Sequence, residues 1–279
     1  MTTLSTLRRA VLGGLLALGA STALHAATLS TLTAAPTNDG VLQNFSGIDW
    51  NANGAGWVQG FVVPPGAGIG TTINFMLTYQ AFASSIGTTS ATSNLYVAAP
   101  GPQAGTYELT TYATLFETAT CQNAACSTIT ITTNAPSVWD VYFDTTPDAD
   151  QAAGTGFLDG VRILGGTFDG GDTLFSSTIG AGGGLLEGTV NFTNSAYVAP
   201  DLLGTTLQAS LIFPGQTAPT YTRPAAFNGV STGANTATDF VLQTDTSQNF
   251  VAAAIPEPGT VLLLAIGLLG MCAFVRRPG

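Results

Sequence analysis

Aspartates are the side chains in this sequence best suited to holding a metal ion. Four of them lie close together in one stretch, at Asp144, Asp148, Asp150 and Asp159. The turn at Pro147 can fold one strand end back towards the next. Calcium takes about six to eight oxygen ligands, which carboxylates and backbone carbonyls can supply. The stretch is therefore a candidate calcium site, although it lacks the EF-hand spacing. The alternative is that these aspartates are turn residues that bind their own backbone.

Few residues are available for catalysis between the two ends of the chain. The sequence has one histidine, His25, and no lysine. A Ser-His-Asp site or a histidine-ligated zinc site therefore cannot be built in the central region. A glycosidase needs two carboxylates roughly 5 to 9 Å apart across a cleft. We expect Glu108, Glu117 and Glu187 to lie on strands and face inward, but no spacing selects a pair. We therefore expect a protein that is not an enzyme and assign no catalytic residue.

Two cysteines lie close together between strand-like segments. Cys121 and Cys126 flank residues 122–125. In an oxidising compartment this spacing predicts a local disulfide at a hairpin tip. The redox-active alternative is weaker because the spacing is not Cys-x-x-Cys and no basic group lies nearby to lower a thiol pKa.

Strand-like segments must position these side chains. Apolar and polar residues alternate with a period of two through residues 71–82. Similar segments, separated by turns rich in Gly, Pro and Asn, cover 57–63, 95–97, 106–117, 128–132, 138–143, 156–168, 173–179, 185–192, 206–213 and 238–242. None of them shows a sustained helical period. The sequence therefore predicts an all-β ectodomain, a β-sandwich or jelly roll, in residues 27–254.

The beginning of the chain has the pattern of a secretory signal peptide. Arg8 and Arg9 precede the apolar or small residues 10–24, and a small-residue exit ends at Ala26. A basic start, a short apolar core and small residues at the exit predict removal of residues 1–26. The alternative is a retained N-terminal anchor.

The last 25 residues, 255–279, combine three features in a fixed order. They are a Pro-Glu-Pro triplet, an apolar run over 261–275 and an arginine pair, at Pro256, Glu257, Pro258, Arg276 and Arg277. Counted from Gly259, the uncharged stretch of 17 residues predicts a transmembrane helix of about 26 Å, at the short end of what spans a bilayer. The arginines mark the cytoplasmic side, because positive charge beside a span resists translocation.

This C-terminal arrangement resembles the PEP-CTERM sorting signal. The resemblance implies recognition by an exosortase, a transient anchor in the inner membrane, and then release to the cell surface or extracellular matrix. The alternative is an ordinary membrane anchor. The runs 141–165 and 238–245 resemble the flocculation-associated PEP-CTERM proteins called PepA. That second resemblance implies a role in holding cells in flocs or biofilm together with exopolysaccharide.

Charge narrows the choice of partners. Arg162 and Arg223 are the only basic residues between the two terminal signals. Of the 16 acidic residues, only Glu257 lies within a terminal signal, so 15 carboxylates remain between them and the net charge there is −13. Nucleic acid is therefore not an expected partner. We expect an exopolysaccharide or cell-surface glycan, bridged by divalent cations or contacted by aromatic rings. The alternative function is a carbohydrate-binding module that uses Trp50, Trp57, Trp139, Tyr142 and Tyr221, although large aromatics in strands often form the core.

Overall fold

The described part of the chain is built from β-strands. The computed structural model describes residues 30–32, 43–86, 107–215 and 221–251, and all regular structure in these ranges is strand. The strands are β1 (Ser30–Leu32), β2 (Gln43–Phe45), β3 (Gly47–Trp50), β4 (Ala55–Gln59), β5 (Thr72–Ile86), β6 (Glu108–Cys121), β7 (Thr128–Asp144), β8 (Val161–Ser176), β9 (Ala181–Thr193), β10 (Val198–Ala199), β11 (Thr206–Pro214), β12 (Ala226–Phe227), β13 (Val230–Ser231), β14 (Phe240–Gln243) and β15 (Asp245–Val251). The all-β prediction is thus confirmed. The expected signal peptide, the strand at 95–97 and the sorting region lie outside the described residues.

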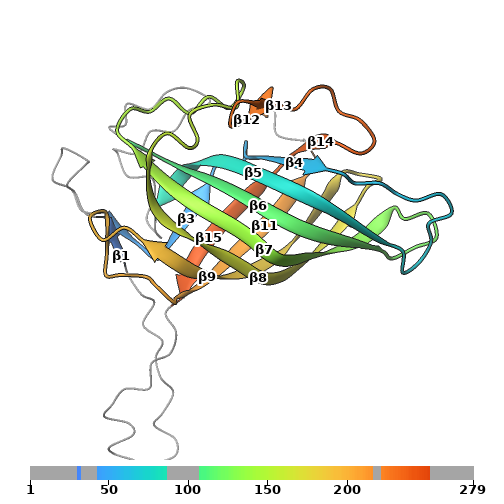
Figure 1. The fold of residues 1–279 in the computed structure, drawn as a ribbon, viewed down its shortest axis with the longest axis horizontal. Coiled ribbons are helices and arrows are strands. Elements are labelled where there is room, and N and C mark those ends of the chain that lie inside the picture. The colour runs from blue at the N-terminus through green and yellow to red at the C-terminus, as the bar shows by residue number, and fades with distance from the viewer. Residues whose placement is uncertain (1–29, 33–42, 87–106, 216–220, 252–279) are drawn as a thin grey trace, which may run out of the picture. The chain divides into compact units, whose positions relative to one another are not determined.

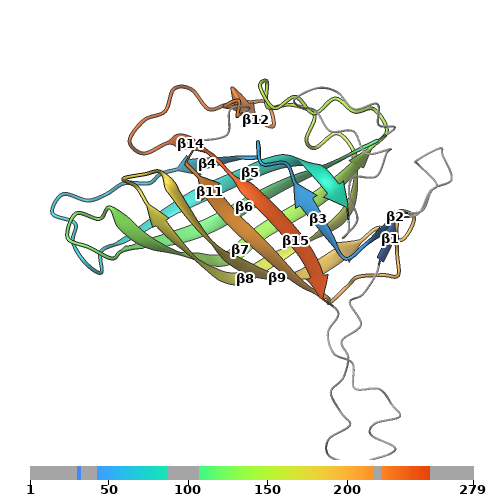
Figure 2. The same ribbon diagram turned by 180° about the vertical axis from the view of Figure 1, so that it is seen from behind.

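Eight of these strands form one antiparallel sheet that closes on itself (Figures 1 and 2). From β5 the hydrogen-bonded neighbours run through β3, β15, β11, β9, β8, β7 and β6, and β6 pairs back to β5. Consecutive long strands from β5 to β9 are neighbours in space, and short turns over residues 122–127 and 177–180 join β6 to β7 and β8 to β9. The structure therefore differs from the predicted sandwich or jelly roll, because a single sheet closes on itself and so pairs its wall strands on both sides along most of their length.

Strands β4 and β14 extend this wall at one end. One edge of β5 pairs with β6, whereas its other edge pairs with β4 at residues 76–80 and with β3 at residues 83–86. On the side away from β5, β4 pairs with β14 and β3 pairs with β15. Strands β3 and β4 therefore act as one interrupted strand of the wall, and β14 and β15 act as another.

Alternate side chains point into the closed sheet and form the main core. On β6, Leu109, Ala113 and Leu115 are buried inside, as the period-two rule requires. Trp139 from β7 is fully buried and lies 6.2 Å, centroid to centroid, from the ring of Phe250 on β15. Full burial of a large apolar side chain contributes about 1.5–3 kcal/mol, so this interior is the main source of stability.

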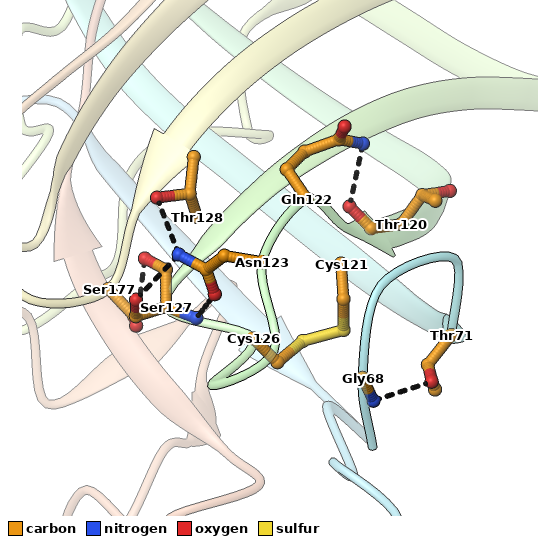
Figure 3. Close-up of a disulfide and its surroundings, with 10 residues drawn as sticks. All are labelled: Gly68, Thr71, Thr120, Cys121, Gln122, Asn123, Cys126, Ser127, Thr128 and Ser177. Carbon is orange, nitrogen blue, oxygen red and sulfur yellow. Dashed lines mark hydrogen bonds between the residues drawn. A yellow bond between two sulfur atoms is a disulfide. The ribbon is translucent and has the colours of Figure 1, made fainter.

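The predicted disulfide closes the turn between β6 and β7 (Figure 3). Cys121 and Cys126 are bonded, with their Cα atoms 4.7 Å apart. Within the turn, the Asn123 side-chain amide donates to Ser127 Oγ (2.9 Å), and its Oδ1 accepts the backbone N–H of Ser127 (2.9 Å). Asn123 and the disulfide together fix the hairpin tip, as expected for a structural cystine.

Candidate functional site

Three carboxylates converge where β6 begins and β7 ends. Glu108 and Asp144 are directly opposite each other on the paired strands, and the loop after β7 brings Asp148 back to them. One carboxylate oxygen from each residue lies within 4.8 Å of the others. We call Glu108, Asp144 and Asp148 the acidic cluster. It lies on the outer side of the sheet, because the neighbours of Glu108, Tyr107 and Leu109, belong to the interior core.

Glu108 holds the loop that carries Asp148. The side chain of Glu108 is 1% exposed, and its Oε1 accepts the backbone N–H groups of Asp148 (3.0 Å) and Ala149 (3.1 Å). Burial raises the pKa of Glu108 to about 7, against the opposing effect of those two hydrogen bonds, and the negative charges of Asp148 and Asp144 raise it further. In the cluster, burial and neighbouring negative charge therefore disfavour the ionised form of Glu108.

Negative charge is also crowded around Asp148, which lies at the surface. Desolvation raises the pKa of Asp148, and the charges of Asp159 and Asp144 raise it further. Asp148 can hydrogen-bond to the Asp159 side chain only in its protonated form, and this interaction raises the pKa of Asp148 as well. Asp144 is partly satisfied, because its Oδ1 accepts the backbone N–H of Thr146 at 2.7 Å. A bound cation would relieve the remaining repulsion, and the donors are the hard oxygens that calcium prefers.

The loop over residues 145–160 is packed onto the outside of the sheet. Phe157 and Ala149 form a small buried cluster with Phe82 of β5. The hydroxyl of Thr110 on β6 donates to the carbonyl of Phe157 at 2.8 Å. The same loop accepts a backbone hydrogen bond from Ala225, in the segment before β12 (Figure 1). The wall therefore fixes the loop and with it the position of Asp148.

The four predicted calcium ligands have different places in this loop. Asp144 and Asp148 lie in the acidic cluster, and Asp159 contacts Asp148. Asp150 instead stabilises the turn in which it lies, because its Oδ1 accepts the backbone N–H groups of Ala152 and Ala153. Sequence reasoning missed Glu108 as a member, because its place opposite Asp144 depends on strand register, and no local pattern reveals that register.

The three glutamates that were expected to face inward do not share a cleft. Glu117 does face the interior and is 3% exposed. Glu108 lies on the outer side beneath the loop, and Glu187 on β9 is exposed. The prediction of a common inward orientation is therefore wrong for Glu108 and Glu187, because each occupies the other face of its strand.

A second polar surface lies on the outer side of β6 to β9. Its members are Tyr112, Asp140, Tyr142, Arg162 and Phe192, which we call the tyrosine–arginine patch. The Arg162 side chain donates from Nε to Asp140 Oδ1 (2.6 Å), and its guanidinium carbon lies 4.3 Å from the Phe192 ring centroid. Burial raises the pKa of Asp140 although Arg162 opposes this shift, and Tyr142 also hydrogen-bonds to Asp140. The patch combines flat aromatic faces with charged hydrogen-bonding groups.

Two of the tryptophans considered for sugar contact are core residues. Trp50 is 1% exposed and Trp139 is fully buried. Trp57 is half-buried, and its ring lies 5.7 Å, centroid to centroid, from Phe227. Trp50 and Trp139 therefore cannot stack on a sugar at the surface, whereas Tyr142 of the tyrosine–arginine patch remains partly exposed.

The fold and these surfaces define an all-β protein with a closed antiparallel sheet and acidic outer loops. Residues 254–277 match the family model of the PEP-CTERM protein-sorting motif. This motif implies exosortase-dependent export with a transient membrane anchor, so the sorting interpretation of this region is confirmed at that level. No curated protein and no solved structure matches the chain. Within the described ranges, no helix has the length and hydrophobicity needed to cross a membrane.

Proposed function

We propose that this protein is an exported component of the cell surface or extracellular matrix with a structural or adhesive role towards exopolysaccharide in flocs or biofilm. The sorting motif supports the destination. The convergence of Glu108, Asp144 and Asp148 is the observation that supports the contact. An acidic protein and an anionic polysaccharide repel each other, so their association needs a bridging cation. The proposed role involves no catalysis.

Calcium is the cation that fits the acidic cluster. It would supply a hard positive centre that accepts oxygen ligands from two molecules at once. Asp144 is partly exposed and Asp148 is exposed, so these two can share an ion with a polysaccharide carboxylate. Glu108 lies beneath them, adds charge, and holds the loop through its two backbone hydrogen bonds.

Binding to hyaluronan-coated beads tests the bridging role, with the processed protein recovered from cells that possess the exosortase. We expect calcium to increase the bound fraction and EGTA to reverse it. The double substitution Asp144→Asn with Asp148→Asn should abolish the calcium effect. The matched control, Asp169→Asn with Asp172→Asn, makes the same charge change on exposed positions of β8 and should retain it. Equal calcium dependence in both double variants would reject the acidic cluster.

A deletion separates sorting from binding. Cells that express the chain without residues 256–279 should lose the protein from their surface and should aggregate less than cells with the full chain. The truncated protein, purified, should still bind the beads in calcium, because the acidic cluster is outside the deleted region. Surface display of the truncated chain at the full level would contradict the sorting step.

The tyrosine–arginine patch favours a second candidate function, a carbohydrate-binding module. Sugar rings stack on flat aromatic faces, and Arg162 and Asp140 offer hydrogen bonds beside Tyr142. Binding to a neutral glycan without calcium, lost in Tyr142→Ala and retained in Tyr142→Phe, would support this candidate over cation bridging. Calcium-dependent binding that is unchanged in Tyr142→Ala would exclude it.

A further inference from the structure

A cavity of about 60 Å³ lies inside one end of the closed sheet. Side chains from β4, β5, β6, β7, β8, β11 and β14 line it, and nearly all of the exposed wall is apolar. The apolar lining includes Val58, Leu77, Ile129, Ile131, Leu211 and Leu242. The polar residues of the lining are Glu117, Thr173 and Ser177. The cavity is distinct from the acidic cluster and from the tyrosine–arginine patch, which lie on the outer side.

Glu117 is the one ionisable group among the residues that line this cavity. It lies between Phe75 of β5 and Thr133 of β7, and Thr133 donates its hydroxyl to Glu117 Oε1 at 3.0 Å. Burial raises the pKa of Glu117 to about 7, and the Thr133 hydrogen bond acts in the opposite direction. No charged side chain in the described ranges contributes to that shift. Below neutral pH, Glu117 is therefore a neutral hydrogen-bond donor in an apolar chamber.

The cavity suits a small organic molecule better than it suits water. A volume of 60 Å³ corresponds to about four to six water-sized spheres. A buried water needs about two to four polar partners, and a largely apolar wall cannot supply them for several waters. A larger apolar cavity, of about 150 Å³, stays dry and takes up benzene or xenon, so a cavity of this volume fits only a smaller molecule.

The strand pairing leaves an approach to this cavity. Pairing of β11 with β15 ends at Ile212 and Asp245. Past this point, β11 continues with Phe213, which pairs only with β9 on its other side. The strand that follows in the wall, β14, pairs with β4 and not with β11. Phe213 and Phe240 therefore line the cavity from two strand segments that no hydrogen-bond ladder joins. Phe240 is only half-buried and meets Phe61 edge to face, with the ring centroids 6.1 Å apart, so two half-buried rings border this approach.

We propose that this cavity binds a small, uncharged, largely apolar molecule with one oxygen that accepts a hydrogen bond from the Glu117 carboxyl group, such as a short-chain ketone. An anionic headgroup has no partner there, because no Lys, Arg or His lines the cavity. An ammonium ion would require two charges to be desolvated in an apolar chamber, which costs several kcal/mol per ion. This proposal does not depend on polysaccharide binding.

The probe pair 2-butanone and butylamine tests the proposal with the processed protein. The two probes are similar in size, but the first is a neutral acceptor and the second is a cation at every pH used. Binding is measured from NMR shifts of the methyl groups of Leu77, Ile129 and Leu211. We expect 2-butanone affinity to fall by roughly 30-fold between about pH 5.5 and about pH 8.5, as Glu117 loses its proton.

Three variants assign the effect to Glu117. Glu117→Gln keeps a donor and should bind 2-butanone equally at both pH values. Glu117→Leu should lose most of the affinity, and Glu187→Gln, at an exposed site, should behave as wild type. If Glu117→Leu does not fold, the pH dependence of 2-butanone affinity in wild type and in Glu117→Gln still tests the role of Glu117. No methyl shift with saturating 2-butanone, a pH-independent wild-type affinity, or tighter binding of butylamine than of 2-butanone would overturn the proposal.

Discussion

The substitution Glu117→Gln tests the physical character of the interior most directly. In the folded protein Glu117 is 3% exposed and has Thr133 as its hydrogen-bond donor. Burial raises its pKa from an ordinary 4.5 to about 7. The unfolded chain therefore releases this proton at a lower pH than the folded chain does. Between about pH 4.5 and about pH 7, the folded state binds more protons than the unfolded state.

The sign of the effect follows from that difference in bound protons. The contribution of Glu117 to stability is fully present below the unfolded pKa, and it is lost as pH rises through the folded pKa. The shift of roughly 2.5 pKa units corresponds to about 3 kcal/mol in the free energy of unfolding, at 1.36 kcal/mol per unit. Glutamine has a similar shape and does not titrate. We therefore expect Glu117→Gln to match wild type near pH 4 and to be about 3 kcal/mol more stable near pH 8.

Urea unfolding of both proteins across this pH range measures the difference. Glu108, whose pKa is also raised to about 7, is present in both proteins, so its contribution cancels in the comparison. The exposed Glu187→Gln should give a curve parallel to wild type. A stability difference between Glu117→Gln and wild type that stays constant with pH would refute the buried, proton-binding state of Glu117.

Three further variants test other parts of the fold. Replacing Cys121 and Cys126 by serine should lower the free energy of unfolding by about 2 kcal/mol relative to oxidised wild type, the chain-entropy value for a short loop, and wild type treated with reductant should show the same loss. Trp139→Ala should cost about 3–5 kcal/mol in urea unfolding, because the side chain is fully buried. Phe157→Ala should release the loop over residues 145–160 and speed its proteolysis while the closed sheet stays intact, and cleavage at the wild-type rate would contradict the packing on Phe82.

The sequence predicted the strands well where alternation is regular, but it divided two long strands. The predicted segments 128–132 and 138–143 are one strand, β7, although Pro136 lies between them. The pairing with β8 shifts register between Thr132 and Ser137, so an irregularity accommodates the proline without ending the strand. On β8, a second shift between Phe168 and Gly170 likewise joins two predicted segments.

Strand β15 was missed because its buried face is partly polar. Thr246, Gln248 and Phe250 alternate inward, and only the last is apolar. The hydroxyls of Thr246 and Tyr79 lie 2.6 Å apart, so this polar group is satisfied inside the closed sheet. A hydrophobic pattern cannot identify such a strand, since the tertiary partner on β5 decides which polar side chain is buried.

Closure of the sheet could not be derived from the same pattern. A sandwich and a closed sheet both require strands with one buried face, so alternation does not distinguish them. The difference lies in pairing, because β5 uses one edge for β6 and the other for β3 and β4. The same pairing places Glu108 opposite Asp144, which explains why four aspartates were visible in the sequence and the glutamate among them was not.

Two glutamates on β6 connect the two proposals and allow them to be separated. Glu108 and Glu117 both have a pKa raised to about 7, but they lie on opposite faces of one strand. Calcium binds a carboxylate, so it should lower the pKa of Glu108. A ketone that accepts a hydrogen bond stabilises a protonated carboxyl, so it should raise the pKa of Glu117.

Carbon NMR titration of the two carboxyl groups should therefore show opposite shifts, each confined to one residue. The wall of the sheet separates the two groups, and no charge on the outer side contributes to the pKa of Glu117. Calcium that moved the pKa of Glu117 as strongly as that of Glu108 would show that the two faces of the sheet are coupled, contrary to the geometry from which both proposals are drawn.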